Sequence, residues 1–180
     1  MDVISENFSH GGVQGVYKHV AKTTECEMTF AVFIPPTKET PPPVLWYLSG
    51  LTCSPETFMI KAHAQRWASE LGIILVAADT SPRDLNIEGA DDSWDLGTAA
   101  SFYLDAKQKP WAQHYQMYTY ILKELPELIH TYFPTKGAKY CSIFGHSMGG
   151  HGALILGLKN PDSYRSISAF SPICAPMLSP

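Results

Sequence analysis

Residues 139–161 read KYCSIFGHSMGGHGALILGLKNP, and this stretch decides the fold. A short apolar run with aromatic and β-branched residues, 140–144, is typical of a buried strand. Gly-His-Ser-Met-Gly follows at 145–149, and an apolar segment rich in small residues continues to Pro161, which stops a helix. The order strand, sharp turn, helix is the context in which G-x-S-x-G carries a nucleophilic serine. We therefore expect Ser147 to be a nucleophile.

The geometry of this turn accounts for its residue types. To lift the Ser147 hydroxyl clear of a sheet edge, the backbone must reverse within a few residues, so a strained conformation with small neighbours is expected. Gly145 and Gly149 supply that room. Because a helix begins here, its free first N–H groups point toward negative charge that develops on a substrate. The Met148 N–H is therefore an expected oxyanion donor.

Two histidines accompany the serine. His146 lies inside the tight turn and His151 lies one turn into the helix. The base of a serine hydrolase comes from a separate loop. We therefore interpret both histidines as structural, with His146 near the site.

The composition is that of one globular domain over residues 1–180. The chain is 45% hydrophobic and 17% charged, with a net charge of −4. Without a basic run, this acidic balance argues against a nucleic-acid partner. No secretory signal pattern and no apolar segment of about 20 residues is present, so we expect a cytoplasmic protein without membrane contact.

No metal or cofactor is predicted. The seven histidines are scattered, and the acidic group at 91–95 lacks calcium-loop spacing, which favours a solvated surface over a cation site. The absence of C-x-x-C spacing indicates reduced thiols for all four cysteines, Cys26, Cys53, Cys141 and Cys174.

The remaining segments predict an α/β fold with a mostly parallel sheet flanked by helices. Residues 13–20 and 28–34 are β-branched segments that predict an antiparallel strand pair at one edge. Residues 44–48 and 73–78 are continuously apolar, as in strands covered on both faces. The segment 54–71 between them has helical spacing, and it predicts one amphipathic helix and a parallel crossover.

The turn after residues 44–48 is a second candidate part of the site. In an α/β-hydrolase arrangement the loop after this strand supplies another oxyanion N–H, and Leu51 is the candidate. Gly50 could instead serve only to turn the chain. Cys53 lies near the site in the first interpretation, and a buried structural thiol is the equally favoured alternative.

Later segments border or complete the sheet. Residues 80–110 form a long polar stretch expected to border the pocket, which places Trp94 near the site. Residues 115–133 have helical spacing, and Pro126 should kink this helix or start a second one. Residues 166–170 predict a further strand.

Six sequence blocks carry a specific resemblance that covers nearly the whole chain: GLTC at 50–53, DTSPR at 79–83, DSWDLG at 92–97, PWAQHYQMY at 110–118, SIFGHSMGGHGAL at 142–154 and FSPIC at 170–174. On these blocks the chain resembles S-formylglutathione hydrolase, also called esterase D. The resemblance implies an α/β-hydrolase fold and a cytoplasmic serine thioesterase without cofactor, often a homodimer. It implies hydrolysis of S-formylglutathione to glutathione and formate in formaldehyde detoxification, with general carboxylesterase activity.

Carried over by motif, Ser147 is the nucleophile, the Leu51 and Met148 N–H groups hold the oxyanion, and Cys53 lies near the site. The chain departs from the family at two loop positions. Asp84 stands where the family has glycine after SPR, and Ala175 stands where it has asparagine after SPIC.

A larger departure concerns the acid and the base. In the family both follow the serine on later loops, whereas the later candidates here are Asp162, at the far end of the helix, and His151. We expect that the triad Asp and His are not in this chain and that about the last third of the fold is missing. A catalytically inactive truncated hydrolase that acts as a binding or interaction fragment is the alternative. Another acyl hydrolase or acyltransferase on the same scaffold is the alternative among enzymes.

Overall fold

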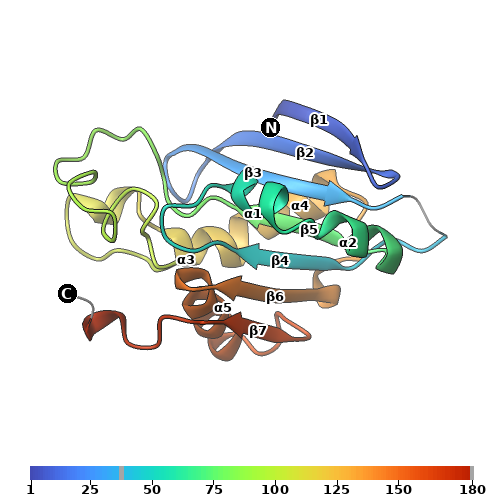
Figure 1. Ribbon diagram of the computed structural model, residues 1–180. Coiled ribbons are helices and arrows are strands. Elements are labelled where there is room, and N and C mark those ends of the chain that lie inside the picture. Colours follow the sequence, from blue (N-terminus) through green and yellow to red (C-terminus); the bar gives the residue numbers. More distant parts are fainter. Residues whose placement is uncertain (37–38, 179–180) are drawn as a thin grey trace.

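One mixed sheet organises the part of the chain that the computed structural model describes, residues 1–36 and 39–178 (Figure 1). Its strand order is β1-β2-β3-β5-β4-β6-β7. The strands from β5 to β7 are parallel, and the pairings among β1, β2, β3 and β5 are antiparallel. The strands are β1 Asp2–Ser9, β2 Gly12–Ala21, β3 Cys26–Ile34, β4 Val44–Leu48, β5 Ile74–Ala78, β6 Cys141–His146 and β7 Ile167–Phe170.

The predicted fold class is confirmed: an α/β fold with a parallel core and N-terminal antiparallel strands. The expected antiparallel pair corresponds to β2 and β3, which are in register from Val13↔Ile34 to Ala21↔Cys26. The expectation that this pair forms the edge of the sheet was wrong, because β1 pairs with the outer side of β2. Most of β1 is exposed, so its sequence lacks the apolar alternation by which strands are recognised.

Helices cover both faces of the sheet (Figure 1). On one face, α1 (Pro55–Lys61) and α2 (Gln65–Leu71) pack against the strands, and the buried cluster there includes Phe33, Phe58 and Leu75. The other face carries α3 (Met117–Thr119), α4 (Leu125–Tyr132) and α5 (Met148–Lys159). The larger cluster on that face includes Trp46, Val76, Ile129 and Leu156.

The helix expected over residues 54–71 is two short helices. Its ends follow the prediction: the Ser54 N–H donates to Thr57 Oγ1 at 3.1 Å, and Gly72 caps the end in the left-handed region at φ 68°. The middle of the segment departs from the prediction, because His63 has φ 49° and interrupts the helical backbone. The apolar spacing is preserved across the break, which is why the sequence pattern did not reveal it.

The helix predicted over residues 115–133 begins at Met117 and changes character before Pro126. A π-helical turn, Tyr120–Glu124, joins α3 directly to α4. Pro126 has no N–H for the preceding turn, and its ring disfavours the regular α-helical spacing there. Pro126 lies in the first turn of α4, which begins at Leu125 and continues directly from the π-helical turn, so the proline does not separate two helices.

A long connection borders the carboxyl ends of the parallel strands. Between Ala78 and Trp111 the described chain contains no helix or strand, as the polar composition predicted, and this segment lies at the left in Figure 1. The strand ends of β4 and β6 lie at the same edge, since Leu48 pairs with Gly145. Within residues 1–36 and 39–178, no helix is long and apolar enough to cross a bilayer.

Candidate active site

Ser147 is the single residue between β6 and α5. Its backbone angles are φ 57° and ψ −117°, a conformation that residues other than glycine rarely adopt. The Ser147 N–H donates to the Phe170 carbonyl at 3.0 Å, and the Ser147 carbonyl accepts from the Ile173 N–H at 3.2 Å. The sharp bend expected from the motif is present, and the last residue of β7 and the segment after it hold the bend.

The flanking glycines leave no room for any side chain. A Cβ on Gly145 would lie 2.1 Å from the Gly149 carbonyl oxygen, and a Cβ on Gly149 would lie 1.8 Å from the Leu48 carbonyl oxygen. Both contacts are with backbone, which cannot rotate away. The first turn of α5 therefore packs directly on the end of β4, as the small residues predicted.

The turn after β4 reaches Ser147. A Cβ on Gly50 would lie 3.4 Å from the Ser147 Cβ, and Leu51 follows as a partly buried residue. In the part of the chain that the structure describes, the turn and loop hydrogen bonds between backbone groups include none from the Leu51 or Met148 N–H. The Met148 N–H adjoins Ser147 in sequence, and the Leu51 N–H adjoins Gly50, where an added Cβ would meet the Ser147 Cβ.

The segment 145–151, here called the elbow, contains two histidines that occupy different environments. His146 is exposed. His151 is 9% exposed, its Nε2 has no hydrogen-bond partner among the described residues, and its ring meets Phe102 edge-on at 6.0 Å. Burial lowers the pKa of His151 below its ordinary value. Among the described residues no side chain hydrogen-bonds the Ser147 hydroxyl, so neither histidine is placed as its base.

Cys53 and Trp94 both border the turn after β4. Cys53 is half-buried, and its carbonyl accepts hydrogen bonds from Thr80 and Arg83. Trp94 is 67% exposed and lines a shallow pocket with Thr52. Trp94 therefore adjoins the turn at Thr52.

The long connection forms one wall of a large cavity, as its length suggested. The cavity has a volume of about 870 Å³, and it is lined by twelve of the residues between Ser93 and Trp111, together with Tyr115, Pro176 and Met177. Phe102 joins it to the elbow, because the Phe102 N–H donates to Met148 Sδ at 3.3 Å. The cavity therefore adjoins the helix that begins at Ser147.

Sequence reasoning missed an ion pair at the end of β5. Arg83 Nε lies 2.8 Å from Asp79 Oδ2, and the Asp79 side chain is 5% exposed. The signal was available as an acid four residues before an arginine directly after an apolar strand. Asp84, which stands in place of the family's glycine, has φ 56°, a region that glycine enters without strain.

The sequence pattern of the family described as putative esterase matches residues 21–180. S-formylglutathione hydrolase of Rattus norvegicus is 52% identical over 178 residues, which cover 98% of this chain and 63% of the relative. The Mus musculus protein of the same name is 53% identical over 176 residues, which cover 97% of this chain and 62% of the relative.

A solved structure gives the same result. The S-formylglutathione hydrolase from Agrobacterium tumefaciens superposes with a TM-score of 0.95 at 50% identity, covering 100% of this chain and 65% of that one. The chain thus spans about 63% of the length of the rat relative. Because the family pattern matches most of its residues, the chain belongs to the putative esterase family, as a homologue of S-formylglutathione hydrolases.

Proposed function

We propose that this chain carries the nucleophile and oxyanion-binding portion of a serine thioesterase that hydrolyses S-formylglutathione to glutathione and formate, with general carboxylesterase activity. The observation that supports it most is the backbone of Ser147, at φ 57° between a strand and a helix, with Gly50 so placed that an added Cβ would meet the Ser147 Cβ at 3.4 Å. The proposed substrate is taken from the name of the relatives, S-formylglutathione hydrolase. A cytoplasmic location and a homodimer stay predictions.

In the proposed reaction, Ser147 Oγ attacks the formyl carbonyl carbon. The carbonyl oxygen gains negative charge, and the Leu51 and Met148 N–H groups donate hydrogen bonds to it. Such preorganised donors contribute most of their effect in the transition state, where the charge is largest. The strained bend directs the Ser147 hydroxyl toward the same space as both N–H groups.

Collapse of the tetrahedral intermediate breaks the carbon–sulfur bond and releases glutathione thiolate. A thiol with a pKa near 8.5 is a better leaving group than an amine, so the leaving sulfur needs little protonation. A base is still needed to accept the serine proton and later to activate the water that releases formate. Without an acid and a base, we expect kcat to be lower by on the order of 10⁴–10⁶.

The test is to treat the chain with a fluorophosphonate and to measure hydrolysis of S-formylglutathione and of an activated aryl ester. We expect a covalent adduct on Ser147, found by mass spectrometry of peptides, and slow turnover of the aryl ester. Ser147→Ala should abolish both, whereas Ser142→Ala, on the preceding strand, should preserve both. An adduct that persists in Ser147→Ala would contradict the assignment of the nucleophile.

A catalytically inactive binding fragment is the second candidate. It is favoured by one observation: no side chain among the described residues hydrogen-bonds the Ser147 hydroxyl. Calorimetric titration with S-methylglutathione, which has no acyl group to transfer, separates the two. Binding of this thioether without labelling or turnover supports the binding fragment, and labelling of Ser147 with aryl ester turnover supports the enzyme.

A further inference from the structure

The turn from Ser49 to Cys53 is anchored at three places. The Ser49 carbonyl accepts from the Tyr103 hydroxyl at 2.9 Å, and the Thr52 N–H donates to the Ala99 carbonyl at 3.1 Å. The Cys53 carbonyl accepts two hydrogen bonds, described below. The anchors surround Leu51, while its own N–H has no backbone partner among the turn and loop bonds of the described chain.

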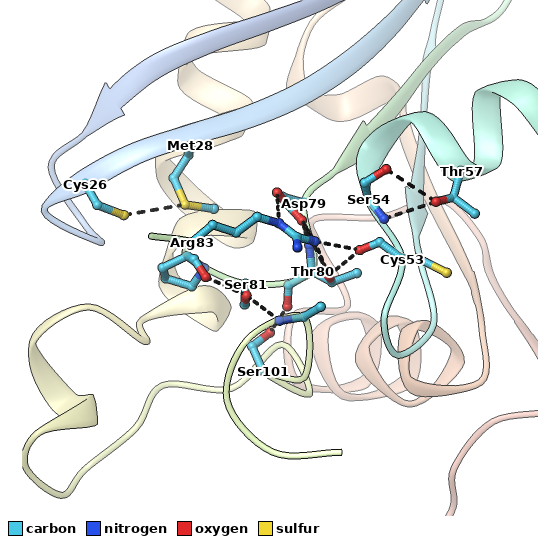
Figure 2. Close-up of polar contacts among 12 residues, drawn as sticks. Cys26, Met28, Cys53, Ser54, Thr57, Asp79, Thr80, Ser81, Arg83 and Ser101 are labelled. Carbon is cyan, nitrogen blue, oxygen red and sulfur yellow. Dashed lines mark hydrogen bonds and ion pairs between the residues drawn. The ribbon is translucent and has the colours of Figure 1, made fainter. Parts of the chain in front are cut away.

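Asp79, Thr80 and Arg83, together called the clamp, fix the last of these anchors (Figure 2). Thr80 Oγ1 donates to the Cys53 carbonyl at 2.6 Å, and Arg83 Nη2 donates to the same oxygen at 2.9 Å. Arg83 is itself oriented by Asp79, through Nε to Oδ2 and Nη2 to Oδ1, both at 2.8 Å. A planar guanidinium held by two carboxylate oxygens has little rotational freedom.

The conformation of Thr52 shows why the turn needs such support. Thr52 has φ 65°, a left-handed conformation that is a true outlier for a β-branched residue. Strain of this kind persists only where the surrounding structure over-determines it. Without its anchors, Thr52 would relax to negative φ and swing Leu51 relative to Cys53.

We propose that the clamp positions the Leu51 N–H for the oxyanion by holding Thr52 in its left-handed conformation. The clamp residues are positioning residues, because they act on the turn and not on the reacting atoms. The role rests on the proposed function of the Leu51 N–H. The clamp's effect on the turn is a physical property that can be measured separately from turnover.

The test uses the ¹⁵N-labelled chain and three variants, Thr80→Val, Arg83→Lys and both together. Thr80→Val removes one donor to the Cys53 carbonyl without changing shape. Arg83→Lys keeps a positive charge beside Asp79, so the carboxylate is not left unpaired. The variant lacks the planar guanidinium that bonds both carboxylate oxygens. In the double variant we expect at least tenfold faster hydrogen exchange of the residue 52 amide and a shifted Leu51 amide signal.

Arg66→Lys is the matched control. Arg66 also pairs with an acid four residues away, Glu70, at 3.1 Å, but the pair is exposed and lies on α2. The control should leave the Leu51 signal in place. Urea unfolding of every variant identifies any that fails to fold, and Thr80→Val alone carries the test if the double variant does fail.

Thr52→Gly provides the decisive readout, because glycine occupies the left-handed region without strain. Added to the double variant, it should return the Leu51 signal toward its original position, which loss of general stability would not do. An unmoved Leu51 signal in the folded double variant, or no rescue by glycine, would overturn the proposal. Fluorophosphonate labelling of the unmodified chain, measured in parallel, reports on the proposed function independently.

Discussion

Gly149 makes the closest backbone approach at the elbow, and its replacement tests that packing at the scale of one residue. In Gly149→Ala the new methyl would meet the Leu48 carbonyl at 1.8 Å, so α5 must move away from β4. We expect the free energy of unfolding to fall by about 3 kcal/mol. Urea unfolding measures the change.

The control is Gly50→Ala, whose methyl would meet the Ser147 Cβ at an ordinary distance of 3.4 Å. Its free energy of unfolding should change by less than about 1 kcal/mol. Equal effects of the two substitutions would mean that α5 does not pack directly on β4.

Residue-level prediction succeeded where the cause is local. The small residues around Ser147 indicated a sharp bend, because any side chain at 145 or 149 collides with backbone. At the clamp, the four-residue spacing of Asp79 and Arg83 was a signal that sequence reasoning overlooked, but the bond from Arg83 to the Cys53 carbonyl, thirty residues away, had no signal. Which backbone carbonyl an arginine reaches depends on the assembled sheet, and no sequence spacing encodes it.

At the scale of the element, β7 is a strand with an unpaired edge. Within the described strands it pairs with β6 alone, and β1 forms the opposite edge. β1 carries Asp2 and Glu6, whereas the β7 sequence ISAF has no charge. Uncharged edges promote pairing with other chains, so we predict self-association through β7.

Ser168→Lys places a charge on this exposed edge. We expect self-association to weaken about tenfold, equivalent to about 1.4 kcal/mol, as measured by sedimentation velocity over a concentration series. Asn7→Lys, on the edge that is already charged, should have a smaller effect. If the two variants behave alike, β7 is not the preferred contact.

Prediction of elements followed the strength of their apolar pattern. β5 is buried at every position, and its unbroken apolar run indicated a central strand. β1 is exposed at nearly every position and gave no signal, because pairing with β2 and not burial defines it. The break between α1 and α2 was hidden because His63 changes the backbone and leaves the apolar spacing intact.

At the scale of the whole molecule, three histidines make stability depend on pH. Burial lowers the pKa of His19, His130 and His151. Above pH 6.5 these groups are mostly neutral in both states, so they contribute little pH dependence. As the pH falls below 6.5, the unfolded chain binds protons that the folded chain does not, and the free energy of unfolding decreases.

Urea unfolding at pH 7.5 and pH 5.5 checks this direction. His19 is 8% exposed, and its Nε2 lies 2.9 Å from the Tyr120 hydroxyl. His19→Gln keeps a polar group there without the titration, and we expect it to remove part of the loss. His10→Asn, at an exposed position, should leave the loss unchanged. A greater stability at pH 5.5 would contradict the prediction.

The main-chain bonds from residue 147 to Phe170 and Ile173 have a mechanical consequence. A displacement of the stretch 170–173 would be transmitted to Ser147, the proposed nucleophile, through two peptide groups, with no side chain in between. We therefore expect a molecule that binds this stretch to change the orientation of the Ser147 hydroxyl without entering the site.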